Sequence, residues 1–126
     1  MPYHVSRGEF SRLVERALKD LPQPFAGALE EMTLEIRDRP TEQELESVGL
    51  GPDELLLGLY VGTPLTERTH QDTGRLPDKI LIFQEDCELV SESKEQLMQE
   101  VRTTVLHELG HYFGLDEDEL DRLGYG

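Results

Sequence analysis

Two histidines and a glutamate stand at a spacing that suits metal chemistry, in the run His107-Glu108-Leu109-Gly110-His111. Residues four apart on an α-helix differ by about 40° around the axis and about 6 Å along it, so both imidazoles can reach one cation. HExxH on a helix is a zinc-site signature. Glu108 flanks that face, where its carboxylate can accept a proton from a zinc-activated water without being a ligand. The pattern therefore predicts a Zn²⁺ site with Glu108 as general base.

The histidines belong to a segment that we expect to form one long helix over residues 94–113. Ser93 and Gln96 predict a capping box at its start, where each side chain satisfies an unpaired backbone amide. On a helical wheel the apolar residues occupy one half, and His107 and His111 fall on the other side. One face of the helix should thus pack on a sheet while the histidines face a cleft.

The third metal ligand must come from another segment, because a catalytic zinc usually takes three protein ligands and leaves one position for water. Gly114 follows His111 by three residues, where a glycine can end a helix by reversing the chain. The next residues are dense in carboxylates, and both Asp116 and Glu117 are candidates. Residues 116–121 also suit the acidic first turn of a last helix, which the helix dipole favours.

Other candidates lie farther from the motif. The long polar segment 62–78 holds His70, a possible substitute ligand, and Arg75, which could bind a substrate carboxylate. Tyr125 could stabilise an oxyanion or simply pack at the end of the chain. Cys87 is the single cysteine, so no intramolecular disulfide can form, and we interpret it as incidental.

The elements that would position these residues are those of an α+β fold. Capping boxes at Ser6/Glu9 and Thr41/Glu44 predict an N-terminal helix, which Pro22 and Pro24 end, and a short second helix. Residues 32–36 alternate between apolar and polar, as in a strand with one buried face. The apolar runs 55–61 and 80–83 suit well-buried strands. We expect a small mixed β-sheet packed against the HExxH helix, with helices at both ends of the chain.

Composition limits the classes of function. A chain of 126 residues supports one domain, 1–126, and no apolar run is long enough to span a membrane. No secretory signal is visible at the N-terminus, which favours the cytoplasm. With 27 acidic and 12 basic residues the formal net charge is −15, so nucleic acid is an unsuitable partner. The acidic excess fits either a solvated surface or a cleft that attracts basic substrates.

The run His-Glu-Leu-Gly-His-Tyr-Phe-Gly-Leu-Asp-Glu resembles the metzincin-style pattern HExxHxxGxx(H/D), and more closely the minimal-zincin family of small bacterial zinc metallopeptidases. The resemblance is strong from residue 80 to 126. The N-terminal two thirds match the family only in length and in the order of the elements. The resemblance implies a zincin-like fold and a third ligand three residues after Gly114. That position holds Glu117 where the family commonly has Asp, so Asp116 stays an alternative.

The resemblance implies a zinc-dependent metallopeptidase that hydrolyses a peptide or protein substrate lying along an exposed sheet edge. Three alternatives stay open. A catalytically weak or inactive zinc-binding or interaction domain would share the fold but not the activity. A metal-dependent endoribonuclease would carry a His-x3-His-x5-His run and a basic surface, which this chain lacks. An acidic partner-binding protein would carry HExxH by accident and bind no metal.

Overall fold

The strands form one three-stranded mixed sheet in the computed structural model, which describes residues 1–64 and 78–125. The strand order is β1-β3-β2, where β1 is Thr33–Arg37, β3 is Lys79–Phe83 and β2 is Gly58–Val61. β1 is parallel to β3 and β2 is antiparallel to it. In the described part of the chain β2 is therefore an edge strand. The expected α+β organisation with a small mixed sheet is confirmed.

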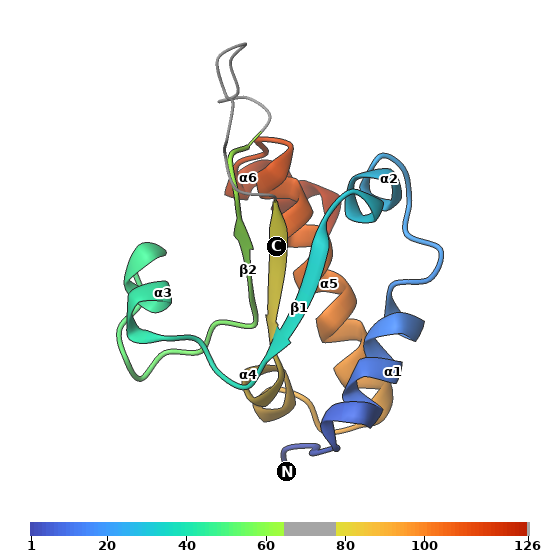
Figure 1. Cartoon of the computed structure of the whole chain (residues 1–126), viewed down its shortest axis with the longest axis vertical. Helices are drawn as coiled ribbons and strands as arrows, with labels where there is room; N and C mark the ends of the chain where they lie inside the picture. The colour runs from blue at the N-terminus through green and yellow to red at the C-terminus, as the bar shows by residue number, and fades with distance from the viewer. Residues whose placement is uncertain (65–77, 126) are drawn as a thin grey trace.

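The helices gather mainly on one side of this sheet. The described helices are α1 (Arg7–Ala17), α2 (Phe25–Glu30), α3 (Glu42–Ser47), α4 (Gln84–Leu89), α5 (Lys94–Tyr112) and α6 (Glu117–Leu123). α5 runs behind the sheet with α1 and α2 beside it, while α3 stands apart on the side of β2 (Figure 1). None of the described helices has the length and apolarity needed to cross a bilayer.

The core lies between the sheet and α5. Leu34 and Ile36 of β1 stand in register with Ile80 and Ile82 of β3, so one face of the sheet presents a continuous apolar surface. Apolar side chains of α1 and α5 cover it, and the innermost of them are fully buried: Phe10, Leu13, Leu97, Val101, Val105 and Leu109. Burying each such side chain contributes about 1.5–3 kcal/mol, so this layer fixes where α5 lies.

A glycine brings β2 unusually close to α5. A Cβ atom on Gly58 would lie 2.5 Å from Cγ2 of Thr104 and 2.9 Å from the carbonyl oxygen of Leu81. Any larger residue at this position would push the strand away from the helix. The edge strand thus lies directly beside the stretch of α5 that carries Thr104 and Glu108.

The predicted helix starts are confirmed. Thr41 and Glu44 form the reciprocal capping box, with both side-chain-to-backbone bonds present. The Ser6 and Ser93 side chains accept hydrogen bonds from the third residue of their helices. The Glu9 carboxylate instead accepts from Arg12, and Gln96 accepts from the backbone N–H of Glu92, so these two caps are one-sided.

Two short helices were not predicted. α2 begins directly after Pro24, in a stretch where the prolines predicted only the end of the first helix. α4 covers the polar run around Cys87, which is fully buried and not incidental to the core. Burial raises the pKa of the Cys87 thiol to about 12, with further contributions from Asp86 and Glu100.

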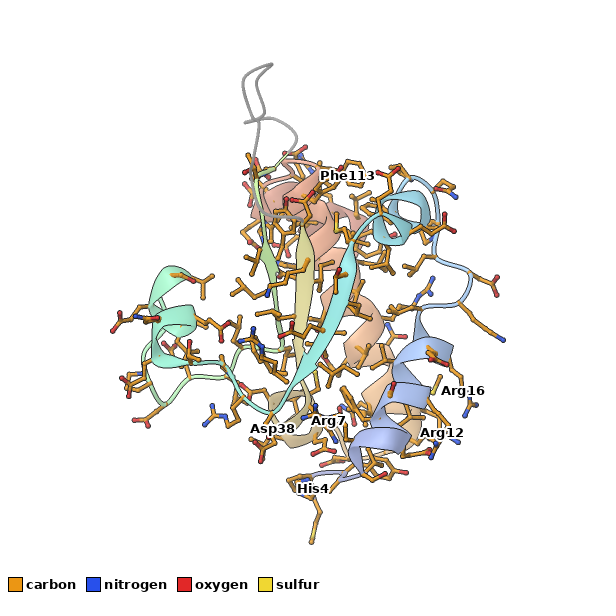
Figure 2. All side chains as sticks on the ribbon, in the orientation of Figure 1. His4, Arg7, Arg12, Arg16, Asp38 and Phe113 are labelled. Atoms are coloured by element: carbon orange, nitrogen blue, oxygen red, sulfur yellow. The ribbon has the colours of Figure 1, made fainter. Side chains whose placement is uncertain are left out.

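Long-range partners explain why a polar run is buried in α4. Asp86 accepts hydrogen bonds from Nε of Arg39 at 3.0 Å and from the backbone N–H of Leu56 at 2.9 Å. At the same end of the molecule Arg7 pairs with Asp38 and donates from Nε to Gln84 at 2.7 Å (Figure 2).

The strand expected over residues 55–61 is shorter in the structure. Only Gly58–Val61 is in the sheet, and Leu55 is exposed. The backbone N–H of Leu56 is bound to the Asp86 carboxylate instead of a strand partner. The expected strand is therefore confirmed for Gly58–Val61 and wrong for residues 55–57, where Leu56 and Leu57 line a hollow.

Candidate metal centre

The histidines of the HExxH motif lie on the last two turns of α5 and face the same space. Their ring centroids are 4.8 Å apart. Oε1 of Glu117, at the start of α6, lies 3.5 Å from Nε2 of His107 and 3.5 Å from Nε2 of His111. The structure thus brings together three of the predicted site residues from two helices.

This arrangement fits a zinc ion. Atoms bound at about 2.1 Å to a tetrahedral zinc lie about 3.4 Å from one another, close to both Glu117 distances. Two imidazoles and one carboxylate are also a donor set found in catalytic zinc sites, with the fourth position left for water. Glu108 lies near as well, since one ligand atom each of His107, Glu108 and His111 fall within 4.8 Å of one another.

The turn after α5 brings Glu117 back to the histidines. Gly114 adopts φ 80°, a left-handed conformation that favours glycine, and the backbone N–H of Leu115 donates to the carbonyl of Gly110 at 2.9 Å. The predicted chain reversal is thereby confirmed. Gly110 also leaves room for Leu120 of α6, because a Cβ there would lie 2.2 Å from Cδ2 of Leu120.

Asp116 has a different structural role from Glu117. Its side chain accepts a hydrogen bond from the backbone N–H of Glu119 at 2.8 Å, and the Glu119 side chain accepts from the backbone N–H of Asp116. Asp116 is therefore the N-cap of α6. The spacing Asp-x-x-Glu is the sequence signal for this cap, and it is more specific than the acidic first turn that we expected.

Glu108 is nearly buried, with 8% of its surface exposed. Its Oε1 accepts a hydrogen bond of 2.8 Å from the backbone N–H of Tyr60 in β2. Burial raises the pKa of Glu108 to about 7, against a lowering by the Tyr60 N–H and by His107. A carboxyl group with a pKa near neutrality can both accept and release a proton at physiological pH.

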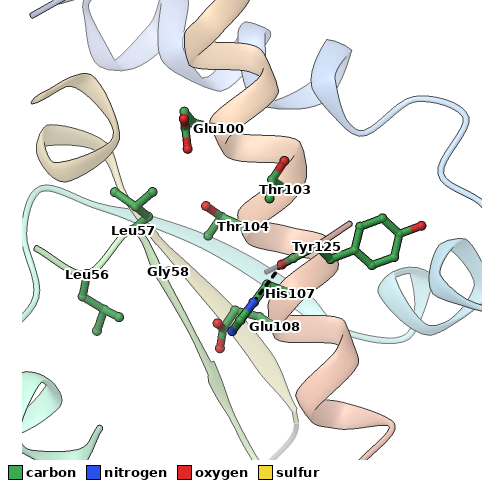
Figure 3. A pocket seen from close by; sticks show the side chains of 9 residues that line it. All are labelled: Leu56, Leu57, Gly58, Glu100, Thr103, Thr104, His107, Glu108 and Tyr125. Carbon is green, nitrogen blue, oxygen red and sulfur yellow. Dashed lines mark hydrogen bonds between the residues drawn. The ribbon is translucent and has the colours of Figure 1, made fainter. Parts of the chain in front are cut away.

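His107 is oriented by the end of the chain. Its Nδ1 lies 2.9 Å from the backbone carbonyl oxygen of Tyr125 (Figure 3). Because a carbonyl only accepts, Nδ1 donates to it in this geometry, and the lone pair of Nε2 is then on the side of Glu117 and His111, where it could bind a metal. Burial lowers the pKa of His111, with a further lowering by His107, and this favours its neutral, metal-binding form.

The Tyr125 ring is held away from the site. It packs edge-on against Phe25 of α2 at 5.6 Å between centroids, and its hydroxyl points away from Glu108 (Figure 3). Of the two interpretations of Tyr125, packing at the chain end agrees with this geometry. The carbonyl of Tyr125 and the N–H of Tyr60 are backbone groups, so no residue pattern could have indicated their contacts with His107 and Glu108.

Two hollows meet at the site. One, of about 520 Å³, contains His111 and Glu117 and has an apolar wall that includes Val48, Leu50 and Leu59. The other, of about 230 Å³, extends toward the N-terminal half of α5. Both are lined by Leu56, Gly58, His107 and Glu108, so Glu108 lies at their junction. His70 and Arg75 lie outside the described residues.

Comparison with known proteins identifies chains similar to this one. Residues 29–126 match the family model described as zincin-like metallopeptidase. A solved structure described as a conserved hypothetical protein from Thermo thermophilus is similar to this chain, with 25% sequence identity and a TM-score of 0.56. The match covers 86% of this chain and 94% of the other. No curated protein matches the sequence.

Proposed function

The chain belongs to the zincin-like metallopeptidase family, and from this we propose that it is a zinc-dependent peptidase. In this proposal His107, His111 and Glu117 hold the zinc and Glu108 is the general base. One observation carries the ligand assignment: a single carboxylate oxygen of Glu117 lies 3.5 Å from the Nε2 atoms of both histidines. Asp116 is less suited as a ligand, because its carboxylate caps α6.

Zinc would supply Lewis acidity, which lowers the pKa of water toward about 7 and polarises a substrate carbonyl. The remaining chemistry belongs to Glu108. Since the Tyr60 N–H holds Oε1, Oε2 is left to take the proton of the attacking water and to pass it to the leaving amine.

The substrate in this proposal is a peptide in extended conformation. β2 is the strand nearest the site, and in the described part of the chain it pairs only with β3. In this proposal a peptide adds along the outer side of β2 as a further strand, with the two hollows receiving its side chains. The contact of Tyr60 with Glu108 ties the position of that edge to the position of the base.

The test is zinc content followed by cleavage. Protein loaded with zinc and dialysed should retain about one zinc per chain by elemental analysis. A mixed-peptide library analysed by mass spectrometry should then show cleavage that 1,10-phenanthroline abolishes and added zinc restores. No zinc uptake at saturating metal would refute the whole proposal. One zinc per chain without chelator-sensitive cleavage would leave a catalytically inactive zinc-binding domain.

A further inference from the structure

The smaller hollow is lined by a second glutamate besides Glu108. Glu100 lies two turns before Glu108 on α5, on the same side of the helix as Thr104 and His107, and it lines this hollow (Figure 3). Among the residues that the structure describes, no cation pairs with the Glu100 carboxylate. Arg102, the basic residue nearest in sequence, donates instead to the carbonyls of Ala17 and Lys19.

The other walls of the hollow fit a long side chain with a polar end. Leu56 and Leu57 form an apolar side, and Thr103 and Thr104 add hydroxyl groups next to Glu100. A lysine or arginine side chain has this same division, with an aliphatic stem that packs on apolar surface and a cationic head. The volume of about 230 Å³ is enough for one such side chain.

We propose that this hollow is a substrate subsite that selects a lysine or arginine side chain near the cleaved bond, with Glu100 as the specificity-determining residue. The inference rests on the proposed peptidase function, because Glu108 and His107 close one end of the hollow. The substrate class is thus a basic peptide, which agrees with the net charge of −15 on the whole chain.

General attraction between an acidic protein and basic peptides must be separated from selection by Glu100. Glu95 provides the matched control, since it is an exposed glutamate in the first turn of the same helix and does not line the hollow. Glu95→Gln and Glu100→Gln change the net charge equally. A pair of peptides that differ only in lysine against acetyl-lysine keeps the length of the side chain and removes its charge.

The experiment compares kcat/KM for the two peptides with zinc-loaded protein. The native protein and Glu95→Gln should prefer the lysine peptide about five- to tenfold, as for a partly exposed ion pair, and Glu100→Gln should abolish the preference. Glu100→Lys should favour a peptide with glutamate at that position. If Glu100→Gln keeps the preference for the lysine peptide, or if Glu95→Gln loses it to the same extent, the subsite proposal is refuted.

A binding measurement keeps this test independent of catalysis. Metal-free protein is titrated with each peptide while the backbone amide signals of Thr103 and Thr104 are followed by NMR. The lysine peptide should shift these signals in the native protein, and the shifts should disappear in Glu100→Gln but not in Glu95→Gln. Shifts without any cleavage would refute the peptidase and keep the subsite, whereas cleavage without this selectivity would refute the subsite alone.

Discussion

The two faces of α5 are held in different ways. On the core face, side chains such as Leu97, Val101 and Val105 are fully buried and contact several neighbours from α1 and the sheet. On the groove face, which lines the two hollows, His107 and Glu108 are each oriented by one hydrogen bond with a distant backbone group. Many weak contacts stabilise the first face together, so the loss of one leaves the rest in place. On the second face, His107 and Glu108 each have one hydrogen bond to a backbone group, so the loss of that bond is not shared with other contacts.

This difference separates stability from chemistry within a single helix. A change on the core face should lower the free energy of unfolding and leave the site intact in the molecules that fold. A change on the groove face should alter metal binding or turnover with little effect on folding. Substitutions on each face, measured for both properties, test whether stability and chemistry are separate.

The largest effect is expected for Glu108→Gln. The amide can still accept the Tyr60 N–H bond but cannot take a proton, so kcat should fall about 10³-fold at unchanged zinc content. Steady-state kinetics and elemental analysis measure the two quantities, with Glu95→Gln as control. Unchanged turnover would remove Glu108 from the mechanism.

The next effect distinguishes the two neighbouring carboxylates. Glu117→Gln removes a proposed ligand, so zinc affinity should fall by more than the roughly 100-fold typical of losing an outer-shell partner. Asp116→Asn keeps an N-cap side chain and should bind zinc as the native protein does. Competition with a chromogenic chelator measures both affinities. The opposite ranking would make Asp116 the ligand.

A third comparison sets one face of α5 against the other. Leu97→Ala, about three turns from the histidines, should lower the free energy of unfolding by about 3 kcal/mol and leave zinc affinity unchanged. Tyr125→Ala keeps the carbonyl that binds His107 but loses the ring contact with Phe25. Zinc affinity should then fall about tenfold with little loss of stability.

Tyr125→Phe keeps the ring and should restore the affinity that Tyr125→Ala loses. The protonation of His107 at Nδ1, followed by ¹⁵N NMR in the metal-free protein, should likewise persist in Tyr125→Phe and weaken in Tyr125→Ala. If Leu97→Ala and Tyr125→Ala reduce stability and zinc affinity in the same proportion, the two faces of α5 are not separable.

The last prediction, which concerns a single ionisable group and no substitution, is a dependence of stability on pH. Burial raises the pKa of Glu108 from 4.5 to about 7, so between these values the folded state holds a proton that the unfolded chain has released. The free energy of unfolding of metal-free protein should therefore fall by about 2 kcal/mol from pH 5 to pH 8 on account of this group. Urea unfolding with EDTA should show a smaller fall in Glu108→Gln. An equal fall would assign it to other groups.

Local patterns in the sequence were sufficient to predict the starts of α1, α3 and α5 and the chain reversal after α5. Thr41 caps its helix and Gly114 reverses the chain as expected, because both effects depend on residues within one turn. Distant partners were not predictable in this way. α4 is a polar run in the sequence, and its burial depends on Arg39 and Leu56, which lie far away along the chain.

The candidate site divides along the same line. The spacing of His107, Glu108 and His111 was predictable, since one helix fixes it. The position of Glu117 depends on how α6 folds back, and the sequence alone did not distinguish Glu117 from Asp116 as the third ligand. Glu100 lies on the same helix stripe as the motif, so its spacing is a signal that could have indicated its place beside the site.

The contact between Gly110 and Leu120 has a consequence for recognising related chains. Gly110 occupies a position that the HExxH pattern leaves unspecified, yet a Cβ atom there would overlap Leu120. A methyl group at that point would require the buried Leu120 side chain to shift, and Leu120 belongs to the helix that carries Glu117. A search that accepts any residue between the histidines would therefore include chains that keep every named ligand but pack their last helix differently from this one.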